Sequence, residues 1–340
     1  AGGPAYVRID GELKPITQLP PLSSTDTDAF AHAMMDERNR GIFVEKGEAD
    51  FAYAAPGGGA RFRVNAFRQR GVVGMVLRLI LSGAPGFDEL GLPPVVRKLS
   101  EEHRGLVLVT GPTGSGKTTT TAAMLGHINR TRRCHVVTIE DPIEVMHRDD
   151  VAIIDQREIG VDTTDFPTAL RAVSRQDPDV IFIGEMRDLE TVTAALQAAE
   201  TGHFVISTLH TTDAAETVHR IIDMYPKEQQ HQARLSLASA LKGIVCQRLV
   251  ASSTGEGRVA VIEALAMTSR IQEFITDPSL TEQVTDAIAE GGYYGMQTFD
   301  QHLLQLFQAG DISLKDALSA ASSPHDFKVA LRAAGLAHAG

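Results

Sequence analysis

A glycine-rich segment between an apolar run and a helical run constrains this chain more than any other stretch. Residues 106–110, Leu-Val-Leu-Val-Thr, have the composition of a buried parallel strand, and residues 111–118 follow with the spacing G-x-x-x-x-G-K-T. Glycines let successive backbone N–H groups turn toward phosphates, and the next helix adds free donors at its N-terminus. The order of strand, loop and helix favours a nucleoside triphosphate site over a glycine-rich turn that binds nothing.

The residue types of this loop indicate how a triphosphate is held. Lys117 supplies a mobile positive charge to the β- and γ-phosphates, and the Thr118 hydroxyl is suited to ligate Mg²⁺. The sequence therefore predicts a nucleoside triphosphate and Mg²⁺ as ligands. The predicted nucleotide-binding residues are Gly111, Pro112, Thr113, Gly114, Ser115, Gly116, Lys117, Thr118 and Thr119.

Composition excludes several classes of protein. The net charge of −11 over 340 residues argues against a broad nucleic-acid interface, which usually carries a basic excess. No apolar run approaches the roughly 20 residues of a membrane span. The two cysteines, Cys134 and Cys246, lie far apart within apolar runs and are expected to be buried thiols of a reducing compartment.

The first 80 residues predict a small α+β domain. Residues 6–16 alternate apolar and polar types around Asp10-Gly11, which is typical of a β-hairpin. Residues 26–43 predict one helix, and residues 50–54, 61–68 and 74–80 predict strands. A glycine turn is expected at 57–59, and the stretch 82–98, which begins with many Gly and Pro residues, is expected to be a linker.

The second part alternates strands and helices, which predicts a parallel sheet covered by helices on both faces. A capping box is expected at residues 213–216 and one long amphipathic helix at residues 227–249. The end of the chain is expected to be helical, with Phe299, Leu303, Leu306 and Phe307 on one face. Further strands are expected at 134–139, 180–183, 203–209 and 259–265.

Acidic and histidine side chains follow three of these strands. Glu140, Asp141 and Glu144 follow one strand, Glu185 follows a second, and His210 follows a third. Because ligands bind outside the carboxyl ends of the strands in open parallel sheets, these side chains are expected to face the phosphate loop.

The roles of these groups differ. Glu185 follows the run Val-Ile-Phe-Ile-Gly, where an acid of the Walker B type holds the Mg²⁺ shell. Glu144 is the leading general-base candidate, with Asp141 and Glu140 as rivals. For His210 three readings stay open: a sensor of the γ-phosphate, a bridge to a neighbouring subunit, or a core histidine.

Arginines are dense in the predicted strands of the first domain. Arg61, Arg63, Arg68, Arg70 and Arg78 are unusual in so acidic a chain. One reading is a solvated face of the sheet. The other is that some of them reach a nucleotide held by the same or a neighbouring chain and stabilise charge on the γ-phosphoryl group.

Long stretches of the chain resemble the type II/IV secretion and pilus ATPases, and among them the type IV pilus retraction ATPases of the PilT and PilU groups. The stretches that carry this resemblance are RFRVNAFRQRG (61–71), GPTGSGKTTT (111–120), TIEDPIE (138–144), DPDVIFIGEMRDLET (177–191), AAETGHFVISTLHTTDAAETVHRIIDMYP (198–226) and GMQTFDQ (295–301).

The resemblance implies a PAS-like domain at 1–81, truncated at its start, then the linker, a RecA-like ATPase core at 99–265 and a helical region at 266–340. It implies that Glu144 is the catalytic carboxylate, that Glu185 belongs to the Walker B segment, and that His203 and His210 form the His box. The family arginines that reach the nucleotide match Arg63 and Arg78 best, and Arg70 is the alternative match.

The same resemblance implies a homohexamer at the cytoplasmic face of the inner membrane. Its expected partners are the pilus platform protein and, in some systems, a paralogous retraction ATPase. The expected function is a Mg²⁺-ATP-hydrolysing motor for pilus retraction and twitching motility.

Departures from the family pattern bear on the branch. No C-x-x-C pair of a four-cysteine zinc module is present, which favours retraction over assembly or secretion members. The AIRNLI motif of PilT members occurs only in altered form at 269–275, and the stretch from Met296 to Ser313 favours PilU members. Alternatives are an assembly or secretion ATPase, a nucleotide-gated accessory subunit, a DNA translocase and a small-molecule kinase; the acidic charge disfavours the third and the lack of an Arg-rich lid the fourth.

Overall fold

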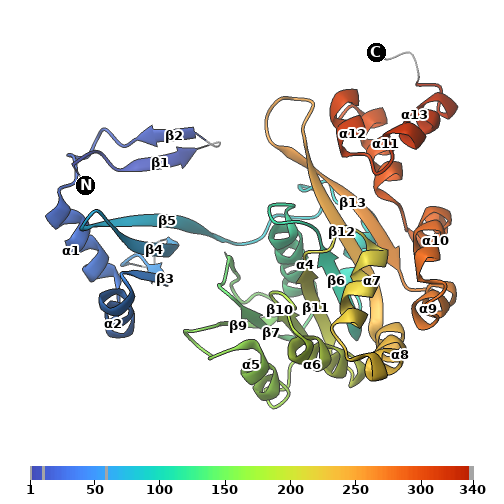
Figure 1. Cartoon of the computed structure of the whole chain (residues 1–340), viewed down its shortest axis with the longest axis horizontal. Helices are drawn as coiled ribbons and strands as arrows, with labels where there is room; N and C mark the ends of the chain where they lie inside the picture. Colours follow the sequence, from blue (N-terminus) through green and yellow to red (C-terminus); the bar gives the residue numbers. More distant parts are fainter. Residues whose placement is uncertain (1, 10–11, 58–59, 337–340) are drawn as a thin grey trace. The chain divides into compact units, whose positions relative to one another are not determined.

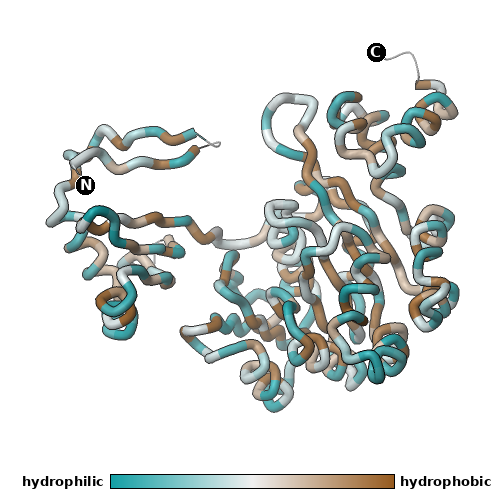
Figure 2. The backbone as a smooth tube through the Cα atoms, viewed as in Figure 1, coloured by the Kyte–Doolittle hydropathy of each residue, from teal (hydrophilic) through white to brown (hydrophobic). Residues whose placement is uncertain are grey.

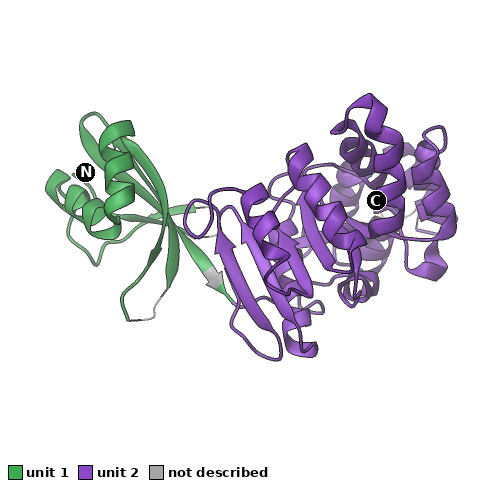
Figure 3. Cartoon of the chain, turned by 90° about the horizontal axis from the view of Figure 1, so that it is seen from below, with its two compact units in different colours: residues 1–82 green, residues 83–340 purple. Residues whose placement is uncertain are grey.

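The computed structural model describes residues 2–9, 12–57 and 60–336, which fall into two compact units. Unit 1 comprises Ala1–Ser82 and unit 2 comprises Gly83–Gly340 (Figure 3). No helix in the described part of the chain has the length and apolar composition needed to cross a bilayer. Each unit has its own buried core, so each is considered separately below.

Unit 1 packs two helices against an antiparallel sheet. Strand β4 pairs with β3 on one side and with β5 on the other, and Val64 and Ala66 of β4 are fully buried against Phe43 and Ala31 of the helices. The expected hairpin is present, although its turn at Asp10-Gly11 lies outside the described residues, as does part of the expected glycine turn at 57–59. The elements are β1 Tyr6–Ile9, β2 Glu12–Pro15, α1 Ser24–Met34, α2 Glu37–Lys46, β3 Glu48–Ala54, β4 Arg61–Gln69 and β5 Val72–Ser82.

The single helix expected at 26–43 is wrong, because the structure divides this region into α1 and α2. Ser23 caps α1 through a capping box with Asp26. Met35 then adopts an extended conformation, and the Asp36 side chain accepts a hydrogen bond from the backbone N–H of Asn39 to begin α2. Two adjacent cap signals therefore outweigh the continuous helical periodicity.

Unit 2 is built on a seven-stranded sheet with the order β13-β12-β6-β11-β10-β7-β9 (Figure 1). Every neighbouring pair is parallel except β12 and β13, so the expected parallel-dominated α/β architecture is confirmed. Figure 2 shows hydrophobic residues concentrated along the central strands. The strands are β6 Gly105–Thr110, β7 His135–Glu140, β9 Ile153–Glu158, β10 Val180–Ile183, β11 Phe204–Leu209, β12 Leu241–Ala251 and β13 Arg258–Ala266.

Helices cover both faces of this sheet. On β6, Leu106 and Leu108 pack into one hydrophobic cluster and Val107 and Val109 into another, because successive side chains of a strand point to opposite faces. The α-helices of unit 2 are α3 Pro94–Ser100, α4 Lys117–Thr131, α5 Phe166–Val173, α6 Leu189–Glu200, α7 Ala214–Asp223, α8 Gln230–Ala240, α9 Ser269–Thr276, α10 Val284–Glu290, α11 Phe299–Ala309, α12 Leu314–Ala320 and α13 Pro324–Ala333. The short elements are β8 Val145–Met146, η1 Lys227–Gln229, η2 Thr281–Gln283 and η3 Gly292–Tyr294. Helix α3 begins inside the stretch expected to be linker.

The long helix expected at 227–249 is wrong. Helix α8 ends at Ala240, and β12 begins at Leu241 and pairs with both β6 and β13. Glycine is required within β12, since a Cβ on Gly243 would collide with Leu99 and with the carbonyl of Leu265. Short apolar runs do not distinguish a buried strand from a buried helix by periodicity alone, and here the pairing decides.

The N-terminus of α7 differs in detail from the expected capping box. Asp213 caps the helix by accepting from the Glu216 N–H at 2.8 Å. The Glu216 carboxylate, however, accepts from the N–H and hydroxyl of Thr212 instead of returning to Asp213.

The edge strand β13 is protected by Gln297, which precedes α11, and by His302 within α11. The Ile262 N–H donates to Nδ1 of His302 at 2.9 Å, and the Gln297 side chain donates to the Ile262 carbonyl at 3.0 Å. Both side chains are buried. These bonds satisfy backbone groups that would otherwise form an open sheet edge.

His302 is expected to make stability depend on acid pH. Burial lowers the pKa of this imidazole to about 4, whereas an unfolded histidine titrates near its usual value. The unfolded chain therefore binds a proton first as pH falls below about 6.5, and stability is lost on acidification. Between about pH 6.5 and pH 5, each pH unit lowers the free energy of unfolding by about 1.36 kcal/mol through this one histidine. Urea unfolding at pH 7 and at pH 5 should therefore show that wild type loses about 2 kcal/mol more stability than His302→Asn. Parallel losses in both proteins would contradict this assignment.

Candidate functional site

The phosphate loop joins the fully buried strand β6 to helix α4. Gly111, Gly114 and Gly116 have φ values of 145°, 81° and 92°, in the region that favours glycine. Gly116 is the residue that precedes α4, and the first two side chains of the helix are Lys117 and Thr118. The predicted strand, loop and helix are therefore all present in the expected order.

Lys117 is buried within this loop. Its Nζ donates to the carbonyl oxygens of Gly111 at 2.6 Å and Pro112 at 3.2 Å. Burial lowers the pKa of Lys117, and the negative charges of Glu185 and Glu144 oppose this effect. Both carboxylates therefore lie close enough to the loop lysine to influence its charge. This is the convergence that the strand-end positions predict.

Glu185 lies just beyond β10 and is only 15% exposed at its side chain. It forms one ion pair with Arg187 at 2.5 Å and a second contact with Nε2 of His210 at 3.1 Å. The structure thus brings together the acid that follows β10 and the histidine that follows β11. Arg187 was not among the predicted site residues, although it lies two positions after Glu185.

The three acids near the end of β7 have different surroundings. Glu140 is buried, accepts from Thr138 at 2.6 Å and Gln156 at 3.1 Å, and its pKa is raised by burial. Asp141 and Glu144 are exposed. Glu140 is therefore held by the core, whereas Glu144 is accessible to a solvent molecule and lies near Lys117. These contacts favour Glu144 over Glu140 as a general base.

His203 lies at the amino end of β11, whereas His210 follows its carboxyl end. Nδ1 of His203 contacts the Ala198 carbonyl at 3.0 Å and Oγ1 of Thr201 at 3.4 Å, beside the end of α6. A six-residue strand spans about 20 Å. The structure therefore separates His203 from the phosphate loop and gives it a local role.

Arg63 and Arg78 face each other in unit 1. They are paired across β4 and β5, and both are exposed. Neither has an ion-pair partner among the described residues of the chain. Like charges directly opposite one another destabilise a sheet, so this pair is suited to an anionic ligand.

The residues around the loop fit a magnesium ion that is shared with a triphosphate. Mg²⁺ usually keeps several waters and takes one or two protein oxygens together with phosphate oxygens. Thr118 is exposed at the start of α4, and Glu185 supplies a nearby carboxylate. Across the described ranges, no group of three or more His, Cys, Asp or Glu side chains is arranged to hold a metal without such help.

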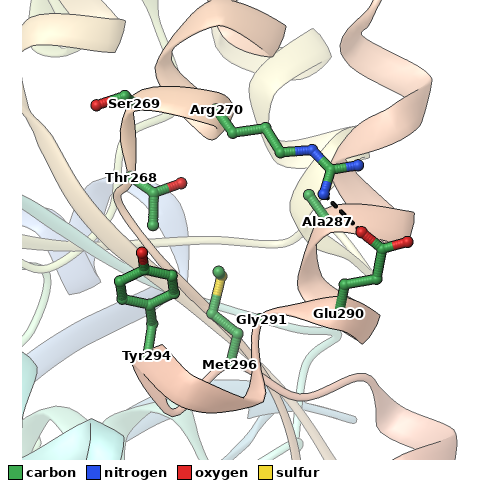
Figure 4. Close-up of a pocket in the computed structure, with 8 residues that line it drawn as sticks. All are labelled: Thr268, Ser269, Arg270, Ala287, Glu290, Gly291, Tyr294 and Met296. Atoms are coloured by element: carbon green, nitrogen blue, oxygen red, sulfur yellow. Dashed lines mark hydrogen bonds and ion pairs between the residues drawn. The ribbon is translucent and has the colours of Figure 1, made fainter.

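A cavity of about 260 Å³ lies elsewhere in unit 2, among the C-terminal helices (Figure 4). An ion pair between Arg270 and Glu290 at 2.5 Å lies at this cavity. Ser269 and Arg270 belong to the altered motif at 269–275, but none of the predicted site residues is part of the lining. The lining residues are Thr268, Ser269, Arg270, Ala287, Glu290, Gly291, Tyr294 and Met296.

Comparison with known proteins decides the family. The model of the family described as "Type II/IV secretion system protein" matches residues 60–317, which is most of the chain. The chain belongs to the type II/IV secretion system protein family. The resemblance inferred from the motifs is thereby confirmed.

Two proteins from Pseudomonas aeruginosa align with nearly the whole chain. The type IV pilus retraction ATPase PilT is 45% identical over 96% of this chain and 94% of its own length. The type IV pilus ATPase PilU is 42% identical over 98% of this chain and 86% of its own length. A crystal structure of the pilus retraction motor PilT with bound ADP has a TM-score of 0.89, with 46% identity over 96% of this chain and 92% of that one.

Proposed function

We propose that this chain is a Mg²⁺-dependent ATPase that powers type IV pilus retraction. The observation that carries the proposal is the convergence of Glu144 and Glu185 on Lys117 at the end of a parallel sheet. The similarity to PilT along nearly the whole chain supports the same function. ADP in the related crystal structure supports a nucleotide as the ligand of the loop.

The proposed mechanism assigns a separate task to each group. Backbone N–H groups of the loop and Lys117 bind the phosphates, and Glu144 accepts a proton from the attacking water. Thr118 and Glu185 would hold Mg²⁺, which when bound offsets negative charge on the phosphates. His210 holds one side of Glu185. Arg63 and Arg78 are proposed to stabilise charge on the γ-phosphoryl oxygens.

The proposal also covers the fold type of each unit and the assembly in which the chain works. Unit 1 is proposed to be PAS-like and the core of unit 2 RecA-like, followed by a helical region. The working form is proposed to be a homohexamer at the inner face of the cytoplasmic membrane, against the pilus platform protein. No nucleic-acid partner is proposed, because the net charge is −11.

A second candidate function is an accessory ring subunit that assists another retraction ATPase. The observation that favours it is the similarity to PilU, which is almost as high as the similarity to PilT. A steady-state ATPase assay of the purified wild-type protein distinguishes the two candidates, because only an autonomous motor requires sustained ATP turnover. Lys117→Ala serves as the negative control for that assay.

Deletion of the gene is expected to leave cells with surplus surface pili and without twitching motility. Retraction removes pili, so its loss increases pilus number while movement stops. Pilus counts by electron microscopy and motility on agar would measure both effects, with the wild-type gene restored in trans as the control. Cells without pili would instead indicate an extension motor and overturn the retraction assignment.

A further inference from the structure

Gln247 on β12 contacts the phosphate loop and α4 although no sequence pattern indicated it. Gln247 is 2% exposed, and its Oε1 accepts a hydrogen bond from the hydroxyl of Thr120 at 2.7 Å. Thr120 lies on α4 and is itself buried. Both partners are therefore removed from water, so this bond has no simple solvent replacement.

The register of the sheet explains why Gln247 reaches this position. Strand β12 runs parallel to β6, and Cys246 is paired with Thr110, the last residue of β6. Gln247 is one residue further along and is level with Gly111, where the phosphate loop begins. Its side chain lies on the sheet face that carries α4, because Val245, two residues earlier, packs against the same cluster as α4.

Two loop glycines make room for Gln247 on the protein side of the loop. A Cβ on Gly111 would collide with the backbone carbonyl of Gln247. A Cβ on Gly116 would lie 2.6 Å from Nε2 of the Gln247 side chain. The loop backbone is therefore in close contact with Gln247 at its first glycine and at the glycine that precedes α4.

We propose that Gln247 is a positioning residue that supports the phosphate loop from the neighbouring strand and keeps it in the conformation that binds ATP. This inference rests on the proposed function, since it assumes that residues 111–118 bind a triphosphate. The loop must hold several N–H donors in one arrangement before the nucleotide arrives. Gln247 supplies that support through the bond to Thr120 and through contact with Gly111 and Gly116.

The role predicts an effect on nucleotide affinity that exceeds any effect on stability. Gln247→Met keeps approximately the same volume and removes the acceptor for Thr120, and Thr120→Val removes the donor. Each is expected to raise the KM and the Kd for ATP about tenfold, the effect of one lost hydrogen bond between buried groups. The double variant should bind ATP as tightly as Gln247→Met alone, because both changes remove the same hydrogen bond.

Gln297→Met provides the matched control. Gln297 is also a buried glutamine that bonds a neighbouring group, but it lies at the β13 edge away from the loop. Gln297→Met is expected to lose about as much stability in urea as Gln247→Met, while its ATP affinity stays at the wild-type value. Steady-state kinetics and equilibrium binding of fluorescent ATP would give KM, kcat and Kd for all five proteins.

Three outcomes would overturn the inference: unchanged ATP affinity in Gln247→Met, fully additive losses in the double variant, or an equal loss of affinity in Gln297→Met. Failure of the proposed function is distinguishable from these. Wild-type protein that binds ATP but does not turn it over would contradict the motor assignment, while the binding measurements would still test the role of Gln247.

Discussion

Replacing Glu144 with Gln is expected to lower kcat for ATP hydrolysis by about 10²–10⁴-fold. Glu144 is exposed, so its carboxylate is available to accept a proton from water. It also lies near the loop, where its negative charge opposes the lowering of the Lys117 pKa by burial. The amide of Gln cannot accept that proton but occupies nearly the same volume. The Kd for ATP should therefore stay within a few-fold of wild type, as measured by binding of fluorescent ATP beside steady-state phosphate release.

The neighbouring acids provide the controls for this experiment. Asp141→Asn removes an exposed carboxylate three residues before Glu144, and Glu140→Gln removes a buried one that is bonded to Thr138 and Gln156. Loss of stability without a comparable loss of kcat is expected for Glu140→Gln. A larger fall in kcat for Asp141→Asn than for Glu144→Gln would transfer the general-base role to Asp141.

Arg63→Ala and Arg78→Ala are each expected to lower kcat by about 10³-fold or more, the usual effect of an arginine that stabilises the transferred phosphoryl group. The two guanidinium groups are paired across β4 and β5 and exposed, and neither has an ion-pair partner in the described part of unit 1. Because these arginines act on charge that develops during hydrolysis, the Kd for ATP should change little.

Arg40→Ala is the matched control, since Arg40 lies on α2 of the same unit and its Nε donates to the His32 carbonyl. It removes one positive charge from unit 1 without touching the paired arginines. Wild-type kcat in both Arg63→Ala and Arg78→Ala would eliminate the proposed role and leave a solvated face of the sheet as the explanation.

Strong local patterns made much of unit 2 predictable. Residues 105–110 form a strand with both faces buried, and the glycine spacing after it is compatible with few structures other than a phosphate loop. The sequence alone did not show which strands pair with one another in the sheet. Residues 241–249 pair with β13, the next strand of the chain, and with β6, which is distant in the sequence. Their strand conformation therefore depends on partners that local periodicity does not reveal.

The candidate site shows the same division. Glu144, Glu185 and His210 could be predicted because each follows a recognisable strand, and strand ends converge in a parallel sheet. Gln247 could not be predicted, because its contact with Thr120 joins residues that are 127 positions apart and depends on β12, where the sequence pattern predicts a helix. The sequence left Glu140 and Glu144 as rival general-base candidates, and the structure distinguishes them because Glu140 is buried and Glu144 is exposed.

The most direct test of the central claim is a crystal structure of the full chain with Mg²⁺ and a non-hydrolysable ATP analogue. We expect the analogue to lie on residues 111–118, Glu185 to lie beside the metal shell, and Glu144 to lie within reach of a water molecule next to the γ-phosphate. A structure in which Glu144 and Glu185 both lie far from the terminal phosphate in every subunit would contradict the motor assignment and leave only a nucleotide-binding protein.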